Sequence, residues 1–148
     1  FIAVDLQLIA NGGTMIWPLI ALSNIAQGAS AVAMLIIYKK NARIKSIAAS
    51  AGISAWLGVT EPAMFGINLK YKYPFVAALI GSALAAVVSI MSGVLANSIG
   101  VGGLPGFLAI QPQYWVPFII AMGVAVVVPR ILTDIINKKF GTDIENLE

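Results

Sequence analysis

The chain has 148 residues, of which 59% are hydrophobic and only 10% are charged, and its mean hydropathy is +0.93. Nine Lys and Arg residues against six Asp and Glu residues give a net charge of +3, and the chain has no cysteine and no histidine. This composition excludes an ordinary soluble domain, which needs a charged surface, and it offers neither disulfides nor histidine acid–base or metal chemistry. We expect no cofactor and no metal.

Long segments without charge dominate the chain. No charged residue occurs within residues 6–38, 46–60 or 73–129, and segments of this kind are typical of membrane-spanning helices. The basic residues stand in short clusters between them, as in loops at a cytoplasmic membrane surface, so we expect no nucleic-acid partner. No basic leader precedes Asp5, so we expect no signal peptide here, and we expect the chain to be part of a longer protein.

Three segments are predicted to cross the membrane. Thr14–Tyr38 corresponds to about 25 residues, or roughly 37 Å of helix, against a hydrocarbon core of about 30 Å. Pro74–Ile99 is rich in Ala and Gly, which let helices approach closely in lipid. Tyr114–Asn137 starts with an aromatic pair and is followed by Lys138-Lys139, which indicates an aromatic belt and a basic anchor. Between the last two spans, Gly100–Gln113 is an uncharged connection rich in turn-forming residues.

The segment of residues 46–69 decides the topology. If it crossed the membrane, Lys70 and Lys72 would lie opposite the basic cluster at residues 39–45; if it returns, every Lys and Arg lies on one side, as the positive-inside rule prefers. Its longer arm, residues 46–60, gives only about 22 Å of helix, which is too short to cross. We therefore predict an all-α, polytopic membrane protein with three transmembrane helices and one re-entrant helical hairpin over about residues 46–69.

The predicted tip of this hairpin is a candidate site. Pro62 removes a backbone donor and disfavours helix before it, while Gly58 and Gly66 permit sharp bends. At membrane depth, freed backbone groups are tolerated only inside protein or along a watery cavity, and a central carboxylate adds a cost on the order of 3 kcal/mol. We predict that Glu61 and these groups face a solute. The alternatives are a structural ion pair or a helix cap for Glu61, and a gate or filter for the re-entrant loop.

Six further positions have either a site role or a structural one. They are Asp5, Trp17, Asn24, Gln27, Trp56 and Arg130. Asn24 and Gln27 lie one turn apart inside a span, where hydrogen bonding between helices is the default role. A snorkelling anchor suits Arg130 best, and packing or interface roles are commoner for the tryptophans than stacking on a sugar ring. For Asp5 both roles stay open.

Several segments resemble a known family. Gly58-Val59-Thr60-Glu61-Pro62 matches the signature G-[IV]-T-E-P of the membrane-embedded IIC component of phosphoenolpyruvate-dependent sugar phosphotransferase systems, in the glucose/sucrose/glucoside superfamily. QLIANGGTMIWPLIALSNIAQGASAVAM and NSIGVGGLPGFLAIQP are also similar to segments of this family. SAGISAWLGVTEPAMFGINLK most resembles the trehalose permeases, with the sucrose and other glucoside permeases as neighbours.

The resemblance implies a place and an activity. Residues 1–148 would be the C-terminal, sugar-binding part of a IIC domain in the bacterial cytoplasmic membrane, with the Lys/Arg loops and the C-terminus cytoplasmic. Such proteins bind a sugar in a cavity lined by the hairpin and move it by an elevator-like displacement. A phosphocysteine of the IIB domain, supplied in turn by IIA, then phosphorylates the sugar 6-hydroxyl. The missing N-terminal half implies a homodimer scaffold, and a histidine is expected upstream of Phe1.

The same resemblance assigns the site residues. Glu61 hydrogen-bonds and orients sugar hydroxyls, and Thr60 and Gly58 add hydroxyl and backbone contacts. The expected activity of the intact protein is phosphotransferase-coupled uptake of a disaccharide, with trehalose as the first candidate, while the 148 residues alone would be inactive. The alternatives are sucrose or another glucoside, an ion-coupled transporter in which Glu61 carries the ion, and a channel or assembly domain.

Overall fold

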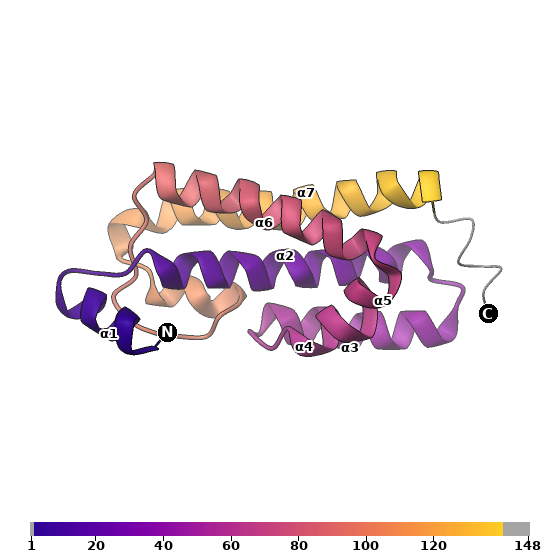
Figure 1. Cartoon of the computed structure of the whole chain (residues 1–148), viewed down its shortest axis with the longest axis horizontal. Coiled ribbons are helices and arrows are strands. Elements are labelled where there is room, and N and C mark those ends of the chain that lie inside the picture. The colour runs from indigo at the N-terminus through magenta and orange to yellow at the C-terminus, as the bar shows by residue number, and fades with distance from the viewer. Residues whose placement is uncertain (1, 141–148) are drawn as a thin grey trace.

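The computed structural model describes residues 2–140, and every regular element in this range is helical. Figure 1 shows the elements arranged along one long axis. They are α1 (Ile2–Ala10), α2 (Ile16–Ile37), α3 (Ala42–Trp56), α4 (Glu61–Ala63), the π-helix η1 (Met64–Asn68), α5 (Leu69–Tyr71), α6 (Tyr73–Met91), the 3-10 helices η2 (Leu104–Ala109) and η3 (Pro112–Tyr114), and α7 (Trp115–Phe140).

Three helices in the described range are long and apolar enough to cross a membrane, which confirms the predicted number of spans. They are α2, α6 and α7. The predicted end of the second span at Ile99 is wrong, because α6 ends at Met91. Gly93 follows with a φ of +64°, a left-handed conformation that commonly terminates a helix. The 19 residues of α6 correspond to about 28 Å, close to the thickness of the hydrocarbon core.

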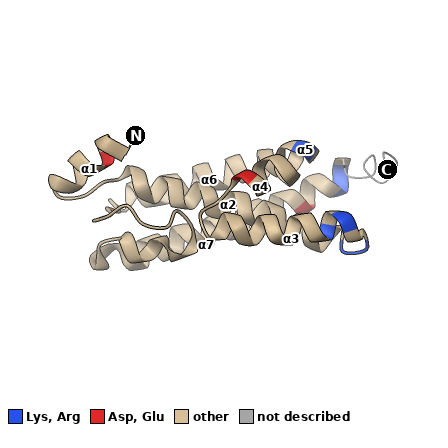
Figure 2. Ribbon diagram, turned by 90° about the horizontal axis from the view of Figure 1, so that it is seen from below, with Lys and Arg blue, Asp and Glu red and all other residues tan. Residues whose placement is uncertain are grey.

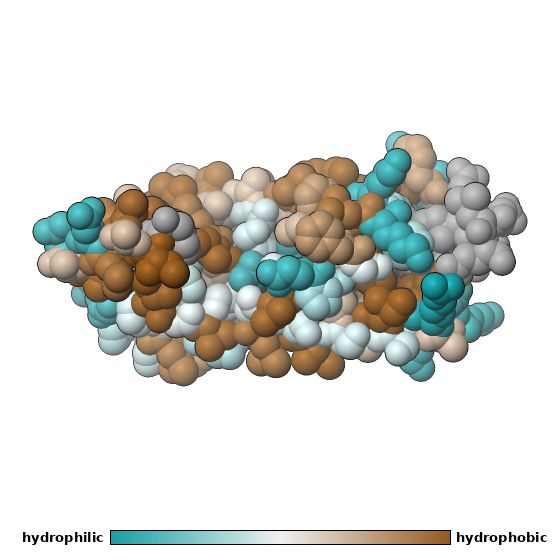
Figure 3. All heavy atoms as spheres, turned by 60° about the horizontal axis from the view of Figure 1, so that its bottom comes forward, coloured by the Kyte–Doolittle hydropathy of each residue, from teal (hydrophilic) through white to brown (hydrophobic). Residues whose placement is uncertain are grey.

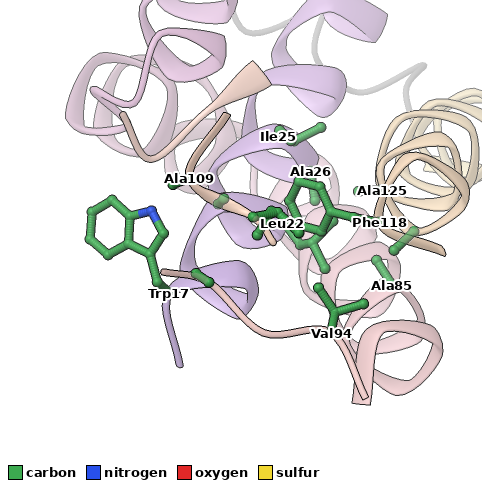
Figure 4. Packing of buried hydrophobic residues seen from close by; sticks show 13 residues of the cluster. Trp17, Leu22, Ile25, Ala26, Ala85, Val94, Ala109, Phe118 and Ala125 are labelled. Carbon is green, nitrogen blue, oxygen red and sulfur yellow. The ribbon is translucent and has the colours of Figure 1, made fainter. Parts of the chain in front are cut away.

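The helix α2 is the central element. It packs against α6 and α7 on one side and against α3 on the other (Figure 1). Leu22 and Phe118 are completely buried and face each other between α2 and α7 (Figure 4). Alanines fill most of the remaining contacts, as expected where helices associate by close packing rather than by exclusion of water. The hairpin segment therefore rests on a closely packed bundle.

A glycine brings α6 and α7 into close contact. A Cβ atom on Gly81 would lie 2.2 Å from Cγ of Pro129, so only glycine lets the two backbones approach this closely. Pro129 lies inside α7, and the Thr133 hydroxyl donates a 2.6 Å hydrogen bond to its carbonyl. Gly81 thus permits the close approach of helices that the Ala- and Gly-rich composition of Pro74–Ile99 predicts.

Basic residues gather at one end of the bundle (Figure 2). The α2–α3 connection, the α5–α6 junction and the end of α7 carry them; they are Lys39, Lys40, Arg43, Lys45, Lys70, Lys72, Lys138 and Lys139. The segment between α2 and α6 leaves from this end and returns to it (Figure 1), as the positions of the basic residues predict. That this end is cytoplasmic stays a prediction, and the C-terminal residues 141–148 lie outside the described range.

Two tyrosine hydroxyls and one amide tie the same end together. The hydroxyls of Tyr38 and Tyr73 lie 2.8 and 2.9 Å from Oδ1 of Asn137, and so connect the ends of α2, α6 and α7. We expect Asn137→Leu to destabilise the full-length protein by about 1–3 kcal/mol, because it removes the oxygen acceptor that the two part-buried tyrosine hydroxyls share. Thermal unfolding in detergent measures this. Asn137→Asp keeps the acceptor oxygens and should lose less; equal losses would contradict this explanation.

At the opposite end, the connection between α6 and α7 folds inward. Thr14 and Ala96 exchange backbone hydrogen bonds, and Ala96 also bridges to Ile110, so the two ends of the connection lie side by side. The residues between them, including η2, run back toward the middle of the molecule (Figure 1). The connection that includes Gly100–Gln113 is thus a second hairpin, a feature that its turn-forming residues did not predict.

Candidate functional site

The turn at the hairpin tip is a glycine-dependent helix cap. After α3 ends at Trp56, the N–H of Gly58 bonds to the carbonyl of Ala55 and the N–H of Val59 bonds to that of Ser54. This pair of bonds is the Schellman motif, which places a left-handed residue after the helix. Gly58 has a φ of +100° and fills that role, which confirms the predicted bend. The helical part of the first arm therefore ends before Gly58 and does not extend to Thr60.

The returning arm changes helix type along its length, and Gly66, where a sharp bend was predicted, lies inside η1 without a positive φ. The arm consists of the short helix α4, the π-helix η1 and the short helix α5 in succession. Pro62 occupies the first turn of α4, where a missing N–H costs little. The arm ends at Lys72, whose φ of +63° is rare for a residue with a side chain and turns the chain sharply into α6. A π-helix inside a helical segment frequently marks a functional site.

The tip lies beside the middle of α2. The indole N–H of Trp56 donates a 3.3 Å hydrogen bond to the carbonyl of Ile25, which is about halfway along α2. The 15 residues of α3 correspond to about 22 Å of helix, so this arm reaches only part of the way along the bundle. The chain therefore folds back at residues 57–60, just before the predicted tip at Thr60-Glu61-Pro62. That the hairpin enters a bilayer from one side only stays a prediction.

Glu61 begins the returning arm with its side chain exposed. Among the described residues its carboxylate has no hydrogen bond and no ion pair, and the hydroxyl of half-buried Thr60 has none either. Figure 3 shows a small hydrophilic area about halfway along this face, surrounded by hydrophobic atoms. The exposed hydrophobic residues near Glu61 in sequence include Val59 and Phe65. The carboxylate of Glu61, about halfway along the bundle, is thus available to accept hydrogen bonds from hydroxyl groups.

The second hairpin meets the first at this tip. A Cβ atom on Gly103 would lie 2.0 Å from the carbonyl oxygen of Trp56 and 2.8 Å from the N atom of Gly58. The Asn24 amide donates a 2.5 Å hydrogen bond to the carbonyl of Gly102 and holds the second tip on α2. Sequence reasoning missed this contact. The signal was present in GVGGLPG, an uncharged glycine-rich segment between two spans, but its position in space was not.

The other candidate residues divide between packing and hydrogen bonding. Gln27 accepts from the Asn68 amide in η1, which confirms the predicted hydrogen bonding between helices. Asn24 instead donates to Gly102, which lies outside the helices in the α6–α7 connection. Trp56 fits against Gly28, where a Cβ atom would lie 2.5 Å from its ring, and so packs rather than stacks on a ligand.

Asp5 and Arg130 lie away from the tip. Asp5 is completely buried in α1, and its Oδ1 atom accepts a hydrogen bond from the Thr14 hydroxyl, which favours the structural role. Arg130 is exposed on α7, consistent with an anchor. Trp17 is 9% exposed and packs at the edge of the core cluster (Figure 4). Residues 2–140 contain no group of three acidic, His or Cys side chains able to hold a metal ion.

Known proteins with similar sequences are components of phosphotransferase systems. The chain is 54% identical over 139 residues to the "PTS system trehalose-specific EIIBC component" of Escherichia coli (strain K12), and the match covers 93% of this chain and 29% of that protein. It is 52% identical to the trehalose-specific component of Bacillus subtilis (strain 168), with 87% of the chain and 28% of the relative covered. The sucrose-specific component of Staphylococcus xylosus is 47% identical, with 82% and 27% covered.

The chain thus spans less than a third of the length of these relatives. No solved structure matches it. Residues 3–82, which include α2 and the whole first hairpin, match the family described as "Phosphotransferase system, EIIC". With more than half of its residues in that match, and with relatives of high identity along nearly all of its length, the chain belongs to the EIIC family of the phosphotransferase system.

Proposed function

We propose that the intact protein takes up a disaccharide, with trehalose as the first candidate, and releases it inside the cell as the 6-phosphate. Residues 1–148 supply the C-terminal, sugar-binding part of its membrane domain. The observation that carries this proposal is Glu61, an acceptor without a protein partner in the described range, at a helix break beside the middle of a transmembrane helix. The names of the relatives favour trehalose and keep sucrose as the second candidate.

Glu61 has the chemistry that a sugar site needs. An ionised carboxylate is an acceptor only, with lone pairs for two sugar hydroxyls. The hydrogen bonds of a charged acceptor are roughly twice as strong as those of a neutral one. Thr60 can donate and accept through its hydroxyl, and the backbone N–H groups of Thr60 and Glu61 have no acceptor among the described residues. Together these groups match the alternating donors and acceptors of a sugar.

In the chemical step, the sugar 6-hydroxyl oxygen forms a bond to phosphorus while the bond from phosphorus to the cysteine sulfur of IIB breaks. The hydroxyl proton must leave, and Glu61 is suited to orient this hydroxyl and help to accept the proton. The IIB cysteine lies outside the 148 residues, which contain no cysteine. The basic end of the bundle, which we assign to the cytoplasmic side, is where IIB would approach. A homodimer formed through the remainder of the IIC domain stays a prediction.

The exposure of Glu61 fits a part of a larger protein. A bare carboxylate halfway across a bilayer must face protein or a water-filled cavity, because exposure to lipid is too costly. In a protein as long as the relatives, the remainder, which is more than two thirds of the length, would supply the other wall of such a cavity.

Uptake assays separate the phosphotransferase from the ion-coupled alternative. Membrane vesicles that contain the full-length protein and its IIA partner should accumulate trehalose 6-phosphate only when phosphoenolpyruvate and the general phosphotransferase proteins are supplied. Collapsing proton and sodium gradients should leave the initial rate unchanged. Accumulation of unmodified sugar that follows a gradient would support Glu61 as an ion carrier instead. Parallel assays with sucrose test the substrate.

A further inference from the structure

One turn of α2 holds both arms of the first hairpin. We call residues 24–28 the central turn. The Trp56 indole donates to the carbonyl of Ile25, and the Asn68 amide donates to the carbonyl of Gln27 at 3.0 Å and to its side-chain Oε1 atom at 2.6 Å. Trp56 precedes Glu61 in the chain and Asn68 follows it, so the chain is attached to α2 both before and after the exposed carboxylate.

Asn68 is unusual for a packing residue. It is completely buried, and Gln27 is only 5% exposed. The Oδ1 atom of Asn68 is buried without a hydrogen-bond partner among the described residues, and so is the hydroxyl of Ser30 on the next turn of α2. An apolar side chain would avoid this cost, since buried polar groups are normally satisfied. The polar pair therefore has a role that close packing alone does not explain.

The π-helix makes the position of Asn68 decisive for Glu61. Asn68 is the last residue of η1, and α4 with Glu61 lies directly before η1. A π-helix places one more residue in the turn than an α-helix does. If η1 relaxed to an α-helix with Asn68 fixed, everything before it would rotate by roughly 100° about the helix axis, the angle per residue of an α-helix. The register held at Asn68 thus determines which way Glu61 points.

We infer that Asn68, whose amide donates hydrogen bonds to Gln27 of the central turn, is a positioning residue that holds Glu61 in the orientation needed to bind the sugar. This inference rests on the proposed function, because it concerns the same site. The inference gives the π-helix η1 a specific role. Its additional residue per turn directs Glu61 outward from the bundle, while the hydrogen bonds between Asn68 and Gln27 keep the returning arm on α2. The bond from Asn24 to Gly102 places the second hairpin against the same turn.

A double-mutant cycle on sugar affinity tests the inference in the full-length permease. Asn68→Leu should raise the trehalose Kd by about five- to tenfold, the amount expected for one buried hydrogen-bonded link. In a Glu61→Gln background the same change should raise Kd much less, because Asn68 acts through Glu61. Gln27→Asn combined with Asn68→Gln conserves the summed length of the pair and should restore most of the affinity. Asn97→Leu, at an exposed asparagine whose side chain has no hydrogen bond among the described residues, is the matched control.

A purely structural role gives a different pattern. In that case Asn68→Leu lowers the unfolding temperature but leaves the Kd of the folded protein unchanged, or it gives the same loss of affinity with and without Glu61. Either result would overturn the inference.

A second measurement does not depend on sugar binding. In a full-length protein with no other cysteine, the Glu61→Cys variant is labelled with a water-soluble thiol reagent, and adding Asn68→Leu should change the labelling rate several-fold. If Glu61→Gln leaves sugar affinity intact, the proposed role of Glu61 in sugar binding fails, and this rate alone decides whether Asn68 positions Glu61. An unchanged rate would overturn it.

Discussion

Replacing Glu61 by Ala in the full-length permease should weaken trehalose binding by about 100-fold, and Glu61→Gln by about tenfold. Hydrogen bonds to a charged group are worth about 1.5–3 kcal/mol, and each 1.4 kcal/mol corresponds to a factor of ten in affinity. Gln keeps one acceptor oxygen but loses the charge, whereas Ala removes both. The geometry behind this expectation is the exposed carboxylate at the hairpin tip, which has no competing partner within residues 2–140. Isothermal titration in detergent measures both constants.

The rate of sugar phosphorylation separates a role of Glu61 in proton transfer from its role in binding. If Glu61 also accepts the proton of the sugar 6-hydroxyl, Glu61→Gln should lower the rate of sugar phosphorylation at saturating sugar as well as the affinity, because an amide is not a base. Asp134→Asn is the matched control, since it removes a half-buried carboxylate on α7 that has no hydrogen bond or ion pair in the described range. A Glu61→Ala protein that binds sugar as tightly as the unmodified protein would remove the assigned role.

Gly103→Ala should disrupt the junction of the two hairpins and abolish sugar binding. The added Cβ atom would meet the carbonyl oxygen of Trp56 at 2.0 Å and its carbonyl carbon at 2.6 Å. Both are backbone atoms, which cannot rotate out of the way as the end of a side chain can. Relief requires one tip to move, and overpacking of this kind costs about 1–3 kcal/mol or more. We expect a lower unfolding temperature and no measurable trehalose binding.

Gly123→Ala is the matched control for this substitution. Gly123 lies inside α7, and a Cβ atom there would meet nothing within 4 Å. Its replacement should leave binding unchanged and stabilise the helix slightly, because Ala is a better helix former than Gly by about 1 kcal/mol. If Gly103→Ala bound sugar normally, the close approach of the two tips would not be needed for the site.

The positions of the spans follow from the sequence because hydropathy is a local property. The starts of α2 and α7 lie within two residues of the predicted ones, and for α7 the aromatic pair Tyr114-Trp115 marks this border. The bend at Gly58 also follows, because a left-handed cap needs glycine wherever the helix is placed. The end of α6 did not follow: residues 92–99 are as free of charge as the helix itself, and an internal cap at Gly93 ends it.

The site was predictable in part. The helix break just before Glu61-Pro62 is encoded locally, by the proline and by Gly58 before it. Its surroundings are not. The sequence does not indicate that Trp56 contacts Gly103 or that Gln27 contacts Asn68, because these residues are far apart in the chain. A polar residue in a membrane span also has many possible partners.

By itself, therefore, the sequence determined three membrane-spanning helices, a broken hairpin between two basic clusters, and a carboxylate at its tip, because charge, hydropathy and glycine or proline geometry act over a few residues. Only the tertiary structure decided that the connection between α6 and α7 folds inward to meet that tip, and that one turn of α2 holds both hairpins. These contacts join residues far apart in the chain, and their energy comes from backbones that fit together only once the bundle has formed.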